Sequence, residues 1–344
     1  MNPKLKRTIN PYKKRFFKFL TSSFKNSRNI SELSQTDKKN IKRILVTRPN
    51  HRLGNQLLIT PLIKAIENEF PSCKVDLLVN GTLSNIIFEN YKSVDKIYTL
   101  PKKPFKNLLE YIKISLKVIS SQYDIAIVGI ETSNSSRIFV KLSNSKFKIF
   151  SSINNNPPVH IAKIPVDSLK SVSNPNHNDL EFPKLDIKLS KAEIEKGSAI
   201  LSNYFKDDRP VISIFTNATG RKKLSKAWWK ELCDLLEIEC SEAYIFEILP
   251  KENTSQVDFE YKSFLSNDIR EMAAVIENCT IFIGADSGVM HLATATNSTT
   301  FGLFNGISNA EVYGPYGKNK FTVETHKVEI KKIVEDIKKF LVRS

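Results

Sequence analysis

Strand-like and helix-like segments alternate along most of this chain, and this alternation limits the fold more than any other feature. Short runs of Val, Ile and Leu, such as residues 44–47, indicate buried strands, and longer amphipathic runs, such as residues 57–70, indicate helices. Strands that alternate with helices build a parallel sheet covered on both faces. At 344 residues the chain is long enough for two such domains.

The pattern predicts where each element lies. The expected strands are residues 44–47, 75–79, 96–99, 124–128, 147–150, 211–215, 243–248, 280–283 and 299–304. The expected helices are residues 57–70, 83–90, 105–121, 191–204, 226–238, 268–278, 290–296 and 327–342. Residues 151–183 are rich in Asn, Ser and Pro, which is typical of an irregular connection.

These segments predict an α/β protein with two doubly wound, Rossmann-like parallel-sheet domains that face each other across a cleft. The expected parts are a basic tail, a first domain, a second domain and a final amphipathic helix, at residues 1–43, 44–183, 184–326 and 327–344. In open α/β sheets ligands bind beyond the carboxyl ends of strands. The turns at those ends are therefore the places to look for function.

The net charge of +16 is concentrated in the tail, because residues 1–43 hold 13 Lys and Arg against two acids. Phe residues are mixed with these cations, which favours contact with an anionic membrane surface over nucleic-acid binding. A disordered solubilising tail is the alternative. The four cysteines form no CxxC pair, and no apolar run is long enough for a membrane span. We therefore expect a cytoplasmic protein, peripheral on the inner face of the cytoplasmic membrane.

The most informative turn follows the expected strand at residues 280–283. Asp286 and Ser287 are suitable helix N-caps, and Gly288 would let a ligand approach the backbone. His291 would lie on the first helical turn. A strand that ends in a turn opening a helix presents unpaired N–H groups, which suit an anion. An ordinary capped turn with a packing histidine is the other interpretation.

The turn at residues 49–56 follows the first strand and contains His51, Arg52, Gly54 and Asn55. It lacks the GxGxxG pattern of dinucleotide-binding turns. A phosphate, a sugar hydroxyl or an acceptor could bind here. The alternative is a helix capped by Asn55, with exposed neighbours.

A third turn follows the strand that ends at Phe215 and begins with Thr216. Ser225 is a plausible N-cap, which would place Lys226 on the first helical turn, where a cation is unfavourable unless an anion is near. Lys226 is therefore a candidate phosphate ligand, whereas residues 221–223 are interpreted as a solvated charge run. Residues 304–308 and 313–317 either shape a sugar or base pocket or are simple loops.

Four ordered blocks in this chain resemble glycosyltransferase family 9, the heptosyltransferases of lipopolysaccharide synthesis. Residues 286–293, DSGVMHLA, are similar to the family's D-S-G-x-x-H-x-A, and residues 314–317 to its G-P-Y-G. Residues 225–228 resemble its S-K-x-W. Residues 53–55 with 60–62 resemble its L-G-D-x-x-x-x-T-P-L.

The resemblance implies a GT-B fold and an inverting transfer that needs no metal and no cofactor. It implies a nucleotide-sugar donor, ADP-heptose in the best-known members, on the second domain. A lipid-linked saccharide acceptor would lie on the first domain, beside Arg52, Gly54 and Asn55. Donor contacts would come from Thr216, Lys226, Asp286, Ser287, Gly288 and His291, with Lys226 neutralising the diphosphate.

One position departs from the family pattern, because Asn55 stands where the family has an aspartate, the general base. An amide cannot take a proton at neutral pH. Either another group, His51 being nearest, is the base, or the acceptor is already anionic, or the protein binds without turnover. The prediction is an inverting glycosyltransferase for a lipid-linked saccharide. Its alternatives are a non-catalytic nucleotide-sugar-binding or scaffolding relative and a nucleotide-sugar epimerase.

Overall fold

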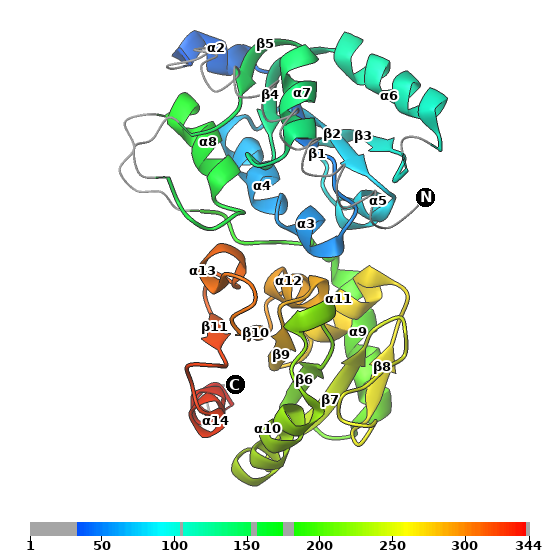
Figure 1. Cartoon of the computed structure of the whole chain (residues 1–344), viewed down its shortest axis with the longest axis vertical. Helices are drawn as coiled ribbons and strands as arrows, with labels where there is room; N and C mark the ends of the chain where they lie inside the picture. Colours follow the sequence, from blue (N-terminus) through cyan, green and yellow to red (C-terminus); the bar gives the residue numbers. More distant parts are fainter. Residues whose placement is uncertain (1–32, 104–105, 153–156, 175–181, 342–344) are drawn as a thin grey trace, which may run out of the picture. The chain divides into compact units, whose positions relative to one another are not determined.

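A computed structural model describes residues 33–103, 106–152, 157–174 and 182–341 (Figure 1). The chain divides into two compact units. The first unit takes in residues up to 51, residues 61–82 and residues 92–183, and the second holds residues 52–60, 83–91 and 184–344. Most of the tail to which the membrane prediction refers lies outside the described residues.

The first unit is built on a parallel sheet of five strands in the order β3-β2-β1-β4-β5. Every central strand is buried along most of its length, as expected when both faces are covered. Its strands are β1 (Arg43–Arg48), β2 (Lys74–Asn80), β3 (Val94–Leu100), β4 (Gln122–Val128) and β5 (Asn144–Ile149). Its helices are α2 (Gln35–Asn40), most of α4 (Thr60–Glu69), α6 (Leu108–Ser120), α7 (Asn134–Leu142) and α8 (Ile164–Ser173).

The second unit contains a parallel sheet of six strands in the order β11-β10-β9-β6-β7-β8. Its strands are β6 (Val211–Phe215), β7 (Tyr244–Leu249), β8 (Ser263–Leu265), β9 (Ile281–Ala285), β10 (Thr299–Phe304) and β11 (Lys320–Glu324). Its helices are α3 (Leu53–Leu57), α5 (Leu83–Ile87), α9 (Lys191–Tyr204), the 3-10 turn η1 (Gly220–Lys222), α10 (Lys226–Glu239), α11 (Ile269–Glu277), α12 (Gly288–Thr294), α13 (Ala310–Tyr313) and α14 (Ile330–Lys338). Helices α10 and α14 lie side by side and share one apolar core (Figure 1).

The structure confirms the predicted α/β class and both parallel sheets, but corrects several local predictions. The Asn- and Pro-rich connection contains a full helix, α8, in which Pro165 occupies the first turn, where its missing N–H costs nothing. The predicted helix at residues 57–70 begins only at Thr60, as α4, and a separate helix, α3, already spans Leu53–Leu57. Asn55 therefore lies inside α3 and does not cap it.

The strand order reverses at one place in each sheet, between β1 and β4 and between β6 and β9. In open α/β sheets this switch point is where the loops from neighbouring strands diverge and leave a crevice for a ligand. The turns that the sequence singled out follow β1, β6 and β9. The topology therefore places them at the two switch points.

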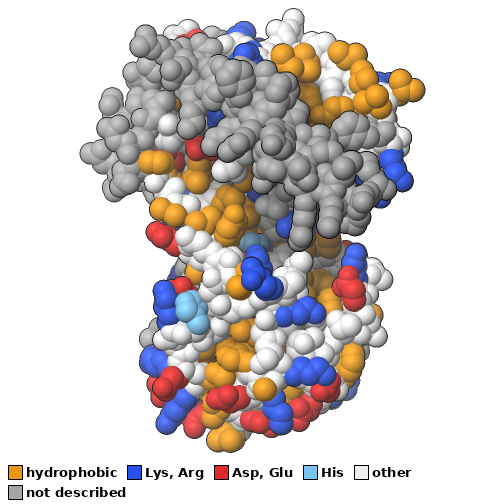
Figure 2. All heavy atoms as spheres, in the orientation of Figure 1, with side chains coloured by type: hydrophobic (Ala, Val, Ile, Leu, Met, Phe, Trp, Pro, Cys, Tyr) orange, Lys and Arg blue, Asp and Glu red, His pale blue; other side chains and the backbone are white. Residues whose placement is uncertain are grey.

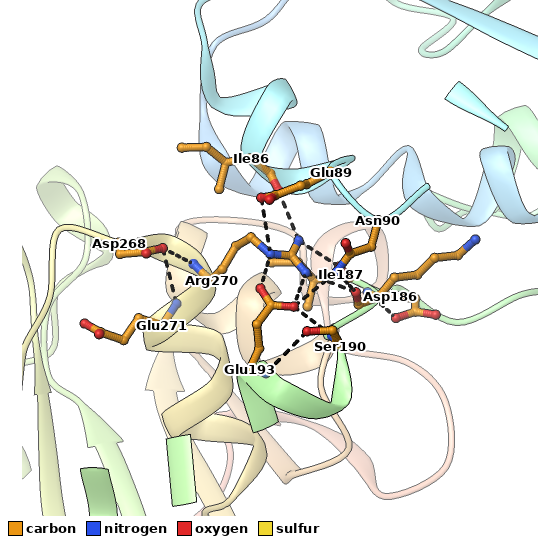
Figure 3. A network of polar contacts seen from close by, with 11 residues as sticks. Ile86, Glu89, Asn90, Asp186, Ile187, Ser190, Glu193, Asp268, Arg270 and Glu271 are labelled. Atoms are coloured by element: carbon orange, nitrogen blue, oxygen red, sulfur yellow. Dashed lines mark hydrogen bonds and ion pairs between the residues drawn. The ribbon is translucent and has the colours of Figure 1, made fainter. Parts of the chain in front are cut away.

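A network of polar contacts within the second unit attaches residues 83–91 to the helices that follow them by a hundred residues or more (Figure 3). Arg270 of α11 is 5% exposed, and its guanidinium donates to the Ile86 carbonyl at 3.0 Å and to the Lys188 carbonyl at 3.0 Å. It also forms a two-point ion pair with Glu193 of α9. Five donors directed at fixed acceptors are a geometry that arginine supplies and lysine does not.

The four cysteines are free and buried, as expected of small apolar side chains. Within the described ranges, every helix is too short or too polar to cross a bilayer.

Candidate functional site

Three loops meet at the carboxyl edge of the second sheet, where β10, β9 and β6 are neighbours. Phe215 at the end of β6 pairs with Gly284 of β9, and Ala285 pairs with Leu303 of β10. The three loops therefore leave the sheet from adjacent positions. Asp286 is the first residue beyond β9, and its N–H donates to the Leu303 carbonyl at 3.0 Å.

Asp286 joins these loops through its carboxylate. The residue is 6% exposed and accepts hydrogen bonds from Lys222, in the loop after β6, and from Ser308, in the loop after β10. The Nζ–Oδ2 distance to Lys222 is 2.5 Å. A buried carboxylate needs a nearby cation or several donors, and here it has both.

The backbone around Lys222 is held in place as well. Gly220 opens η1 at φ +61°, a conformation that favours glycine, and the Asn305 amide donates to the Arg221 carbonyl at 2.8 Å. The Lys222 side chain remains 34% exposed, so its ammonium can also reach a ligand. The sequence interpretation of residues 221–223 as a solvated run was therefore wrong for Lys222. Its counter-charge lies 64 residues away, and no local pattern signals it.

The N-cap prediction for α12 is confirmed at Ser287, whose hydroxyl accepts from the Met290 N–H at 3.2 Å. The space beside Gly288 is filled by α3, since a Cβ there would lie 3.2 Å from the Leu53 Cβ. A Cβ at Gly54 would lie only 2.5 Å from Cδ2 of His291. Gly54, Gly288 and the buried His291 thus pack α3 against α12, and any donor contact from Gly288 is left to its backbone.

Lys226 is the first residue of α10, and Ser225 caps that helix as predicted, accepting from the Trp228 N–H at 3.1 Å. Lys226 forms an exposed ion pair with Asp258. Asp258 and Phe259 both adopt positive φ, at 52° and 60°. Lys226 of α10 therefore contacts the loop between β7 and β8, whereas Lys222 contacts Asp286.

Thr216 is fully buried, and its hydroxyl donates to Glu247 of β7 at 2.7 Å and accepts from the Gln256 N–H. Burial raises the pKa of Glu247, and the Thr216 hydrogen bond opposes that rise. The Thr216 side chain therefore joins the end of β6 to β7 and to the loop that follows β7.

The predicted base His51 and the residues predicted on the acceptor side fall in different units. His51 is exposed in the first unit and lies with Lys102 around Gly81, which has φ +76°. Arg52 precedes α3 as its N-cap residue, and Gly54 and Asn55 lie within α3; all three belong to the second unit. The roles predicted for the site residues remain predictions.

The chain matches the family model described as glycosyltransferase family 9 (heptosyltransferase) over residues 117–339, well over half its length. It is 22% identical over 303 residues to lipopolysaccharide heptosyltransferase 3 of Escherichia coli, covering 77% of this chain and 84% of that protein. Two solved structures share its fold. A family 9 glycosyltransferase of Veillonella parvula superposes with a TM-score of 0.70 at 16% identity, over 88% of this chain and 98% of that one. The ADP-heptose lipopolysaccharide heptosyltransferase II of E. coli superposes with a TM-score of 0.62 at 14% identity, over 88% and 99%.

These similarities confirm the predicted fold class, GT-B, and the predicted enzyme class. The chain belongs to glycosyltransferase family 9, the heptosyltransferase family.

Proposed function

We propose that this glycosyltransferase moves heptose from a nucleoside diphosphate donor to a lipid-linked saccharide, with inversion and without a metal ion. The observation that carries the proposal is the cluster of Lys222, Asp286 and Ser308 at the switch point of the second sheet. The names of the similar proteins, which include ADP-heptose and lipopolysaccharide, support this choice of donor and acceptor class.

In the proposed reaction an acceptor hydroxyl oxygen attacks the anomeric carbon from the face opposite the diphosphate. The bond between that carbon and the phosphate oxygen breaks, and its electron pair leaves with the nucleoside diphosphate. Negative charge grows on the leaving group, so cations fixed near it stabilise the transition state. Helix α12 has only seven residues, so we assign most of this stabilisation to lysines rather than to its dipole.

Lys222 and Lys226 are the lysines that we propose for the diphosphate. Lys222 is anchored by Asp286 but partly exposed, and Lys226 is exposed beside Asp258. Each would exchange a carboxylate partner for a phosphate oxygen when the donor binds. The backbone at Ser287 and Gly288 and the side chains of Asp286 and His291 would then contact the sugar.

The proton of the acceptor hydroxyl needs a base other than Asn55. We propose the imidazole of His51, because a neutral imidazole nitrogen can accept a proton and an amide cannot. Its exposure in the first unit leaves it accessible to an acceptor. Lys102, which lies with His51 around Gly81, would bind an anionic group of that acceptor.

Thermal stabilisation without added metal tests the donor site. The full chain would be melted alone and with ADP, ADP-heptose, UDP and adenosine. A ligand at ~100 times its dissociation constant adds about 2.7 kcal/mol to the folded state. We expect ADP and ADP-heptose to stabilise the protein, and Asp286→Ala and Lys226→Ala to lose that shift. Lys230→Ala is the matched control, because Lys230 is exposed one turn further along α10.

Transfer is then measured with ADP-heptose and a lipid-linked acceptor in excess chelator. Product formed under these conditions supports metal-free transfer, and product formed only with added metal contradicts it. Donor binding without any product would favour the scaffolding alternative, for which Asn55 is the observation. Altered donor without an acceptor would favour the epimerase.

A further inference from the structure

Helix α6 of the first unit carries an apolar ridge that faces solvent. Leu109 is 85% exposed, Leu116 62%, Leu108 52% and Ile112 44%. These four are a large share of the exposed big apolar side chains among the described residues. Figure 2 shows the hydrophobic group of side chains over α6 at the upper right of that view.

This ridge is separate from the face with which α6 packs on its own unit. Val118 is fully buried, and Tyr111, Ile114 and Ile119 pack on the core of the first sheet. At about 100° per residue the four ridge residues fall within one ~100° sector, apart from Tyr111, Ile114 and Val118, and Ile119 packs inward within that sector at the last turn. The helix therefore has two apolar faces, and the protein covers one of them. Contiguous exposed apolar surface of this kind marks an interaction site.

The charges around the ridge identify what it fits. Lys102, Lys103, Lys106, Lys113 and Lys117 are all exposed, and Glu110 is the single acid in residues 101–120. Lys113 and Lys117 follow the ridge on the helix surface by one further step of rotation. A second copy of the chain would bring like charges together, whereas an anionic lipid surface complements them.

We propose that α6 docks this enzyme on an anionic bilayer, with the ridge at the acyl boundary and the lysines on the headgroups. A helix of 13 residues is about 20 Å long, too short to cross the hydrocarbon core, so it lies in the plane of the interface. This contact is independent of residues 1–32 and of the sugar that the enzyme transfers.

A fluorescent label on the ridge tests the proposal in the full chain. Leu109→Cys would carry an environment-sensitive dye. Burial raises the thiol pKa of Cys73, Cys233 and Cys279 to about 12 and that of Cys240 to about 11, so labelling favours the introduced cysteine. With vesicles of phosphatidylcholine and phosphatidylglycerol we expect a blue shift, which vesicles of phosphatidylcholine alone do not produce.

Ile238→Cys on α10 is the matched control. Ile238 is 72% exposed but lies between Glu237 and Glu239, so its dye should stay in water. A blue shift at residue 109 alone supports the proposal. No shift at residue 109, or equal shifts at both positions, overturns it.

Co-sedimentation of the variant L109Q/I112Q/L116Q gives an independent measurement. The three side chains are exposed, so the fold should persist. Loss of three inserted side chains should weaken partitioning into anionic vesicles on the order of 100-fold. Unchanged partitioning would mean that another segment, such as the basic tail, holds the enzyme on lipid, and would refute docking through α6.

Discussion

The carboxyl edges of the two sheets are built from the same topology but carry their charges differently. At the second edge, Lys222 and Ser308 both donate to Asp286, and Thr216 donates to Glu247. At the first edge, the loop after β1 contains the exposed His51, the loop after β3 contains the exposed Lys102 and Lys103, and Glu131 follows β4. At the second edge a carboxylate holds Lys222, whereas the loop after β3 at the first edge has no acid beside its exposed lysines.

This difference fits the different requirements of the donor and the acceptor in a transfer reaction. A preorganised hydrogen-bond network suits the leaving diphosphate, because groups already in position need no reorganisation when negative charge develops. Exposed cations suit a partner that brings its own negative charge, such as an anionic saccharide on a membrane. Mutations at the second edge should therefore affect folding and donor binding together, and mutations at the first edge should affect turnover alone.

His51→Gln should produce the largest effect and no loss of stability. Removing a general base typically lowers kcat by about 10²- to 10⁴-fold. The exposed position of His51 predicts an unchanged melting temperature and an unchanged shift with ADP. Adding Asn55→Asp to this variant should restore part of the rate if the family's aspartate position can still deliver a base. If the His51→Gln variant retains its kcat, His51 is not the general base.

Lys222→Met should affect both properties. Loss of one group that stabilises the developing charge should lower kcat/KM by about 10²- to 10³-fold. It also leaves the buried Asp286 carboxylate without its cation, so the melting temperature should fall. The matched control is Lys223→Met, an exposed neighbour in the same loop, and Lys102→Met is the counterpart at the first edge. If all three variants lose the same stability, the ion pair at the second edge contributes no more to folding than an exposed lysine does.

Acid should weaken the second unit through Glu193. The Arg270 guanidinium holds the pKa of Glu193 at about 2, below its ordinary 4.5. Because the folded pKa is depressed, this stabilisation is complete above pH 4.5 and is lost as the pH falls toward 2. It amounts to at most about 3 kcal/mol. Urea midpoints between these pH values should fall more steeply for the wild type than for Glu193→Gln, and parallel curves would contradict the ion pair.

The alternation of strands and helices was enough to predict both parallel sheets, since buried strands and amphipathic helices differ in period. Local capping was predictable too, as Ser225 and Ser287 show. Helix α8 was missed because Asn and Pro around it favour loops, although Pro165 is compatible with a first turn. Helix α3 was missed because Gly54 has low helix propensity, which packing against α12 overcomes.

Only those parts of the candidate site that depend on residues close together in the sequence could be predicted. The turn after β9 could be recognised from its own residues. The choice between Lys222 and Lys226 could not, because it depends on Asp286 and Asp258, which are 64 and 32 residues away. The assignment of residues 52–60 to the second unit likewise depends on contacts made across more than two hundred residues.

Gly54→Ala tests that last assignment. The new Cβ would meet the His291 ring at 2.5 Å, so α3 or the ring must shift. Overpacking of this kind typically costs about 1–3 kcal/mol, and we expect the lower end because α3 has only five residues. The double variant Gly54→Ala/His291→Ala should recover that loss, since each change then occupies the space that the other vacates. The free energies of unfolding of the two single variants and the double variant would be compared in denaturant. If the losses are additive, Gly54 and His291 do not hold α3 against α12, and the assignment of residues 52–60 to the second unit loses its support.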